Sequence, residues 1–190
     1  ESARIPGPRE RRAILAGIPE RFRQATFEGY TASGMAQGAA RKAAEVFSER
    51  FAVRRQDGGS MLFLGRPGTG KTHLACATLM AVVSDDRWTG RYTDAWSLMS
   101  EVKATWRRTS PESEEEVIQR YVRPDLLVLD EVGVQYGSDT ERAILHRVLD
   151  LRYQAMRPTI VIGNVSLEGM KDYLGERAVS RLMEGGKVIP

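Results

Sequence analysis

A glycine-rich stretch between two apolar segments limits the fold of this chain more than any other feature. It reads GRPGTGKTH over residues 65–73, after the apolar run 61–64 and before an apolar segment that begins at Leu74. The stretch matches the pattern G-x-x-x-x-G-K-[S/T], in which a strand turns through glycines into a helix. The backbone N–H groups of such a turn, together with the positive end of the helix dipole, bind phosphate. The sequence therefore predicts a phosphate-binding loop in an α/β domain.

Side chains at the end of the stretch have predicted roles. Lys71 is placed to bridge the β- and γ-phosphates of a nucleotide, and the Thr72 hydroxyl to bind Mg²⁺. His73 is given no catalytic role, because a side chain just inside the helix can simply pack. A glycine turn without a ligand is the alternative, and the flanking strand and helix argue against it. The residues expected to contact the nucleotide are Gly65, Pro67, Gly68, Thr69, Gly70, Lys71, Thr72 and His73.

Two adjacent acidic residues follow a second apolar run. LLVLD, residues 126–130, has the form of a strand buried in a parallel sheet. Asp130, at the carboxyl end of that strand, faces the ligand crevice and can hold the water shell of Mg²⁺. Glu131 is suited to polarise a water for in-line attack on the γ-phosphate. The pair favours hydrolysis over phosphoryl transfer to a metabolite, and a purely structural acidic pair is the alternative.

Three residues nearer the end of the chain are further candidates for phosphate contacts. Asn164 ends the apolar run TIVIGN, residues 159–164, and is expected at the same sheet edge as Asp130. A strand-capping amide is the alternative for Asn164. Arg177 and Arg181 lie four residues apart, on one face of a predicted helix. An arginine that reaches the phosphate of a neighbouring subunit stabilises a transition state, whereas surface arginines without a role are the alternative.

The remaining segments predict helices between short strands. A helix is expected over residues 35–51 with Ala39, Ala43, Val46 and Phe47 on its apolar side. GRYTD, residues 90–94, predicts a short strand whose last residue, Asp94, caps the next helix. In that helix Trp106 continues the apolar stripe and is expected in the core. This alternation predicts an α/β domain with a parallel sheet.

Two further helix starts are predicted from capping signals. Ser110, Pro111 and the acidic residues that follow indicate one start, with carboxylates at the positive end of the dipole. Ser138 and Glu141 have the spacing of a capping box before the other. Residues 1–30, rich in proline, glycine and arginine, are expected to form a linker or clasp on a domain of residues 31–190.

Composition narrows the class of protein only slightly. The chain of 190 residues has 28 basic and 25 acidic side chains, a balance that permits an anionic partner without requiring one. The single cysteine, Cys76, lies in an apolar segment and is expected to be a buried thiol. No apolar run reaches the ~20 residues that span a bilayer, and the N-terminus lacks the apolar core of a signal peptide. We expect a cytoplasmic protein without a membrane partner.

The assembled motifs resemble those of the AAA+ ATPases of the DnaC and IstB group, the replicative-helicase loaders and their transposition-helper relatives. The resemblance runs from GIPERF and TFEGY through GRPGTGKTHLA, LLVLDEVGVQ and TIVIGN to LGERAVSRL. It implies a three-layer αβα P-loop NTPase with a parallel sheet, and ATP or ADP with Mg²⁺ as cofactors. It also implies that Asp130 and Glu131 are the Walker B pair, Asn164 is sensor 1, and Arg181 is the arginine finger, supported by Arg177.

Within this group, DEVGVQYGSDTE is similar to the DnaC-type loaders. That likeness implies an ATPase that self-associates through AAA+ interfaces and places a hexameric replicative helicase on single-stranded DNA. Such loaders resemble the replication initiator in an extra helix that contacts single strands. Lys103, Arg107 and Arg108 occupy the matching region and are candidates for phosphate contacts, with a solvated helix face as the alternative.

The chain also departs from the loaders that it resembles. Loaders of this type carry an N-terminal domain that grips the helicase, and only residues 1–30 could be its remnant here. The chain stops at KVIP, where a last strand should still be forming, so we expect that strand to be truncated. Three other functions stay open: a transposition helper on duplex DNA, a nucleotide-gated adaptor with little hydrolysis, and a small-molecule kinase. Glu131 and the C-terminal arginines argue against the kinase.

Overall fold

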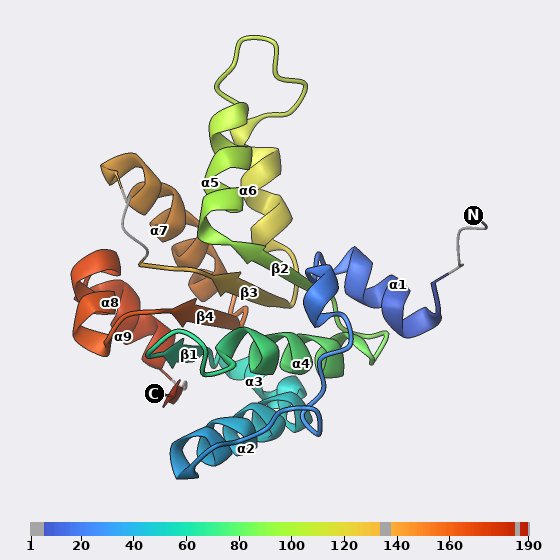
Figure 1. Ribbon diagram of the computed structural model, residues 1–190. Helices are drawn as coiled ribbons and strands as arrows, with labels where there is room; N and C mark the ends of the chain where they lie inside the picture. The colour runs from blue at the N-terminus through green and yellow to red at the C-terminus, as the bar shows by residue number, and fades with distance from the viewer. Residues whose placement is uncertain (1–5, 134–137, 185–186, 190) are drawn as a thin grey trace.

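The centre of the molecule is a parallel sheet in the order β2-β3-β4-β1-β5. The computed structural model describes residues 6–133, 138–184 and 187–189 (Figure 1). The last strand, expected to be truncated, is formed over its three described residues and pairs with β1. The strands are β1 (Met61–Leu64), β2 (Gly90–Asp94), β3 (Leu126–Asp130), β4 (Thr159–Gly163) and β5 (Lys187–Ile189).

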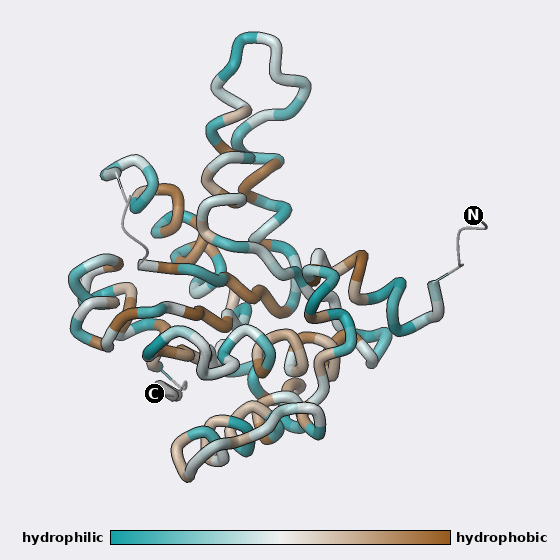
Figure 2. Tube along the Cα trace, in the orientation of Figure 1, coloured by the Kyte–Doolittle hydropathy of each residue, from teal (hydrophilic) through white to brown (hydrophobic). Residues whose placement is uncertain are grey.

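Helices cover both faces of this sheet and complete a three-layer αβα architecture (Figure 1). Helices α1 to α4 pack on one face and α5 to α9 on the other, because alternate residues of each strand enter opposite core clusters. The most hydrophobic stretches of the chain gather in the strands between these layers (Figure 2). The predicted α/β fold is confirmed. The helices are α1 (Pro8–Leu15), η1 (Glu20–Phe22), α2 (Met35–Glu49), α3 (Phe51–Asp57), α4 (Lys71–Val83), α5 (Ala95–Ala104), α6 (Glu114–Val122), α7 (Asp139–Gln154), α8 (Leu167–Leu174) and α9 (Glu176–Met183).

The N-terminal segment, residues 6–30, lies against the face of the sheet that α4 covers. Ala13, Ile18 and Tyr30 are buried in the core cluster of that face. The segment also joins the sheet edge, because the backbone N–H of Tyr92 in β2 donates to the Ala16 carbonyl at 2.7 Å. The segment therefore shares the core of the domain.

Helices α5 and α6 form a hairpin that projects from the body of the molecule (Figure 1). Asp94 caps α5 as predicted, since its Oδ1 accepts from the backbone N–H of Ser97 at 2.7 Å. The core position predicted for Trp106 is wrong. Helix α5 ends at Ala104, so the helical stripe does not continue to Trp106, which is 53% exposed and donates through Nε1 to Glu114.

The start predicted for the next helix is also displaced. Helix α6 begins after Ser113, whose side chain and that of Glu116 form a reciprocal capping box, whereas Ser110 bonds within the preceding turn. The acidic residues of the first turn lie where the dipole favours them. The capping box predicted at Ser138 and Glu141 is confirmed at the start of α7.

The buried face of α2 is shifted by one residue from the predicted one over the first turns of the helix. Phe47 is buried as predicted, but Ala40 and Ala44 are buried in place of Ala39, which is exposed, and Ala43, which is half-buried. A shift of one residue rotates a helix face by about 100°. The aromatic packing of Phe47 against Phe51, with ring centroids 6.1 Å apart, fixes this orientation.

One buried arginine forms hydrogen bonds to the ends of several elements. Arg152 in α7 is fully buried, and its guanidinium lies among backbone carbonyls at the end of α6 and before β3 and β4. It donates to the carbonyls of residues 121, 122, 124, 125 and 158, and its Nε donates to Thr159 Oγ1 at 2.9 Å. Buried carbonyls need hydrogen-bond donors. This side chain therefore joins α7 to the end of α6 and to the segments that precede β3 and β4.

Candidate functional site

Residues 65–70 connect the carboxyl end of β1 to the first turn of α4. Gly65, Gly68 and Gly70 have φ values of 128°, 81° and 84°, which side chains other than glycine rarely adopt. A Cβ on Gly70 would lie 2.4 Å from the Tyr30 ring, whereas the space at Gly68 is open. Helix α4 begins at Lys71, so the free N–H groups of its first turn border the loop. This backbone has the form that phosphate binding requires.

Lys71 is buried with its ammonium group turned into the loop. Its Nζ donates to the carbonyl oxygens of Gly65 at 3.0 Å and Arg66 at 2.7 Å. Burial lowers the pKa of Lys71, and the nearby Asp130 charge opposes that change. The phosphate oxygens of a bound nucleotide would offer this ammonium group stronger, charged acceptors in place of the carbonyls.

Asp130 and Thr72 meet at the carboxyl end of β3. The Thr72 hydroxyl donates to Asp130 Oδ2 at 2.8 Å, and the Tyr92 hydroxyl donates to the same oxygen at 2.9 Å. The other oxygen, Oδ1, accepts from the backbone N–H of Glu131 at 2.7 Å. A hydroxyl and a carboxylate are the hard oxygen ligands that Mg²⁺ prefers.

Glu131 follows Asp130 in an unusual backbone conformation. Its φ of 57° is in the left-handed region, which residues other than glycine seldom occupy and which recurs at functional sites. Desolvation, with the charges of Asp130 and Asp94, raises the pKa of Glu131 above its ordinary value. A raised pKa makes the carboxylate a stronger base, as proton abstraction from water requires.

These residues line one cavity of about 480 Å³, within the size range of small-molecule sites. Asn164, at the end of β4, lies in its wall together with the loop, Asp130 and Glu131. The N-terminal segment adds Arg21 and Phe22, which sequence reasoning missed because neither belongs to a chemical motif. The lining residues are Arg21, Phe22, Pro67, Gly68, Gly70, Lys71, Thr72, His73, Asp130, Glu131, Ile162 and Asn164.

The donor set of this cavity suits a nucleoside triphosphate with Mg²⁺. The open backbone at Gly68 leaves room for phosphate oxygens, and Lys71 supplies a buried positive charge. The described residues contain no group of three or more His, Cys, Asp or Glu side chains that could hold a metal ion. An ion at Thr72 and Asp130 would therefore complete its shell with phosphate oxygens and water, which is the usual arrangement for Mg²⁺.

The N-terminal segment also contacts the outside of the phosphate loop. The Tyr30 hydroxyl donates to the Thr69 carbonyl at 2.7 Å, and His73 Nε2 lies 2.8 Å from the Thr26 carbonyl. The rings of Tyr30 and His73 are 5.8 Å apart. His73 thus lines the cavity and also packs against residues 26–30.

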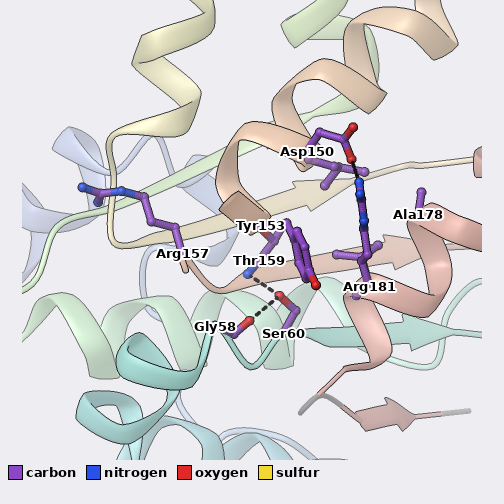
Figure 3. A pocket seen from close by; sticks show the side chains of 10 residues that line it. Gly58, Ser60, Asp150, Tyr153, Arg157, Thr159, Ala178 and Arg181 are labelled. Carbon is purple, nitrogen blue, oxygen red and sulfur yellow. Dashed lines mark hydrogen bonds and ion pairs between the residues drawn. The ribbon is translucent and has the colours of Figure 1, made fainter. Parts of the chain in front are cut away.

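The two candidate arginines of α9 lie outside the nucleotide cavity. Arg181 forms an ion pair with Asp150, and its guanidinium carbon lies 4.9 Å from the centroid of the Tyr153 ring (Figure 3). The small pocket around Arg181 includes Ser60 and Thr159, at the amino ends of β1 and β4. The phosphate loop follows the carboxyl end of β1. Arg181 therefore lies at the opposite end of the strands, near their amino ends.

Arg177 lies one turn earlier on the same helix. It is exposed and, within the part of the chain that the structure describes, has no hydrogen-bond or ion-pair partner. Neither Arg177 nor Arg181 is placed to contact a nucleotide held by its own loop. Arg177 is the one that is free to reach a neighbouring molecule.

The three basic candidates of the hairpin differ in their surroundings. Lys103 forms an ion pair with Glu141 of α7 at 2.8 Å, which lowers the pKa of that carboxyl. Arg107 and Arg108 are exposed in the connection between α5 and α6, next to the exposed Trp106. Trp106 was missed as a surface residue, because its spacing matched the apolar stripe of α5.

Two other expectations can be compared with the described residues. Cys76 is fully buried as predicted, and burial raises its pKa to about 12. In the described ranges, no helix combines the length and apolar character needed to cross a bilayer. Residues 134–137, part of the stretch similar to DnaC-type loaders, lie outside the described residues.

Comparisons with known proteins agree with this geometry. The family model of the IstB-like ATP binding proteins matches residues 9–184. Replicative helicase loaders DnaC from Buchnera aphidicola subsp. Schizaphis graminum and from Escherichia coli K12 are each 35% identical, over 91% of this chain and 69% of the relative. A crystal structure of the DnaC helicase loader has a TM-score of 0.80 at 27% identity and covers 90% of this chain and 98% of that one.

Proposed function

Because the chain belongs to the family of IstB-like ATP binding proteins, we propose that it is a Mg²⁺-dependent AAA+ ATPase that helps to load a replicative helicase onto single-stranded DNA. The observation that carries the ATPase proposal is the meeting of Lys71, Thr72, Asp130 and Glu131 in one cavity. The loader role is supported by the likeness to the DnaC loaders. A protein with this role is expected to act in the cytoplasm.

Each residue of the cavity has a distinct part in the proposed hydrolysis. The loop backbone and Lys71 bind the phosphates, while Thr72 and Asp130 hold Mg²⁺. Mg²⁺, when bound, neutralises negative charge on the phosphate oxygens. Glu131 takes a proton from the attacking water, and Asn164 orients that water or the γ-phosphate. The raised pKa of Glu131 supports its role as the base.

Self-association is part of this proposal, since both arginines of α9 lie away from their own cavity. In an assembly through AAA+ interfaces, Arg181, with Arg177 in support, would complete the site of the neighbouring subunit. The exposed position of Arg177 supports a direct contact from that residue. The N-terminal segment, residues 6–30, is proposed to take part in helicase binding from within the domain whose core it shares.

Variants at Arg177 and Arg181 test this arrangement. Each change to alanine is expected to spare nucleotide binding and to lower ATP turnover by roughly 10³-fold, the lower end of arginine-finger effects. Mixing either variant with Glu131→Gln should restore turnover, because some interfaces then combine an intact arginine with an intact Glu131. Arg142→Ala, at a half-buried position of α7 where Arg142 pairs with Asp139, is the control. Absence of recovery at every mixing ratio would contradict an arginine supplied by a neighbour.

The single-stranded DNA partner is tested at the hairpin tip. ATP turnover and binding should respond to single strands more than to duplex. Replacing both Arg107 and Arg108 with serine should weaken single-strand binding about 10-fold at moderate salt and reduce the slope of log K against log salt by about 1.4. Lys103→Ser should do less, because Lys103 is already paired with Glu141. Arg123→Ser, at the other end of α6, is the control.

The other outcomes of the DNA experiment identify the alternative functions. A response to duplex alone would favour a transposition helper within the same family. Tight ATP binding without turnover under any condition would favour a nucleotide-gated adaptor. If the slope of log K against log salt is the same in the double variant as in the wild type, the hairpin tip is not part of the DNA interface.

A further inference from the structure

Asp130 receives a hydrogen bond from a residue that no sequence motif contains. Tyr92 lies on β2, one strand away from Asp130, and the register pairs Tyr92 with Val128 and Asp94 with Asp130. Residues two apart on a strand share a face, so Tyr92 and Asp130 both point to the side that α4 covers. The Tyr92 hydroxyl reaches Asp130 Oδ2 at 2.9 Å.

The surroundings of Tyr92 hold its hydroxyl in place as a donor to this carboxylate. Its ring packs against the α4-side core, and its backbone N–H is bonded to Ala16. Both ends of the residue are therefore fixed.

The three hydrogen bonds that Asp130 accepts come from donors in different parts of the structure. Thr72 is itself a proposed Mg²⁺ ligand, and the N–H of Glu131 belongs to the neighbouring residue. Among the described residues, Tyr92 is thus the one donor to Asp130 that comes from outside the phosphate loop and the acidic pair. Donors that orient a ligating or water-holding carboxylate change metal affinity without touching the metal.

We propose that Tyr92 is a positioning residue, which fixes the Asp130 carboxylate through its hydroxyl and thereby sets the Mg²⁺ requirement of nucleotide binding. The inference rests on the proposed function, since it presumes that the cavity binds a nucleotide with Mg²⁺. It adds a residue of β2 to the site and attributes to that residue a property distinct from catalysis.

Tyr92→Phe tests the inference, because the change removes the hydroxyl and keeps the ring. The measurement is the affinity for a fluorescent ADP analogue in EDTA and across a Mg²⁺ titration. In the variant, the half-saturating Mg²⁺ concentration should rise roughly 10-fold, the lower end of the 10- to 100-fold loss of affinity expected when a metal ligand loses its hydrogen-bond partner. Affinity in EDTA should equal that of the wild type.

Tyr121→Phe is the matched control. Tyr121 is fully buried on the opposite face of the sheet, so its loss removes a buried hydroxyl without touching Asp130. An equal Mg²⁺ requirement in wild type and Tyr92→Phe would overturn the inference, as would an equal rise in both variants. A wild type that binds no nucleotide, or binds it equally well in EDTA and Mg²⁺, would instead contradict the proposed function.

Discussion

Replacement of Glu131 with glutamine is expected to lower ATP turnover by roughly 10²- to 10⁴-fold, the range that general-base catalysis contributes. Glutamine keeps the size and shape of the side chain but cannot accept the proton of the attacking water. Nucleotide binding should persist, because Lys71, Thr72 and the loop backbone are unchanged. Turnover and the affinity for a fluorescent nucleotide, measured on the same preparation, separate the two effects.

The pH dependence of ATP turnover is a second test of the role of Glu131. Glu131 acts as a base only when deprotonated, so turnover should fall as the pH drops through its pKa. Because that pKa is raised by desolvation and by Asp130 and Asp94, the fall should begin at a higher pH than for an ordinary glutamate. Glu168→Gln, on the exposed surface of α8, is the control and should leave both rate and profile unchanged. A Glu131→Gln variant with wild-type turnover would remove Glu131 from the mechanism.

Replacement of Arg152 with methionine is expected to cost about 4 kcal/mol of unfolding free energy or more, since several buried carbonyls lose their donor at once. For a chain of this size, that cost corresponds to a fall in Tm of roughly 8–16 °C. Methionine fills a similar volume, so the creation of a cavity is not the cause of the expected loss of stability. Unfolding in urea, followed by circular dichroism and linear extrapolation, measures the change.

Arg147→Met on the same helix is the control for the loss of charge. Arg147 is exposed and forms ion pairs with Glu114 and Glu115, which are expected to contribute less than about 1 kcal/mol. Arg152→Lys should lie between the two, because an ammonium group reaches fewer of the carbonyls. Equal stability of Arg152→Met and Arg147→Met would mean that the carbonyls find other donors, such as water.

The sequence predicts best those parts of the site that depend on a few adjacent residues. The turn around Gly68 and Gly70, the ends of two buried strands at Asp130 and Asn164, and the capping box at Ser138 all follow from local chemistry. The cavity joins most of them because the carboxyl ends of parallel strands share one sheet edge. The roles assigned to Glu131, Arg177 and Arg181 stay predictions until turnover is measured.

Contacts between distant segments were beyond local reasoning. Tyr92 meets Asp130 across a strand pair, and Tyr30 meets Thr69 across 39 positions of sequence. Arg152 has no sequence signature of burial, because arginine on a helix is usually a surface residue. The core position predicted for Trp106 is wrong for a related reason, because the apolar spacing continues to Trp106 although helix α5 ends at Ala104.

The N-terminal segment affects the thermodynamics of binding, because it contacts both the phosphate loop and the strand β2, whose Tyr92 bonds to Asp130 of the cavity. It holds the phosphate loop through Tyr30 and the strand of Tyr92 through Ala16. A macromolecule that binds only the lifted segment must first break both contacts. By reciprocity, the factor by which it weakens nucleotide binding equals the factor by which nucleotide weakens its own binding. Calorimetric titrations begun from either ligand must then return the same coupling free energy.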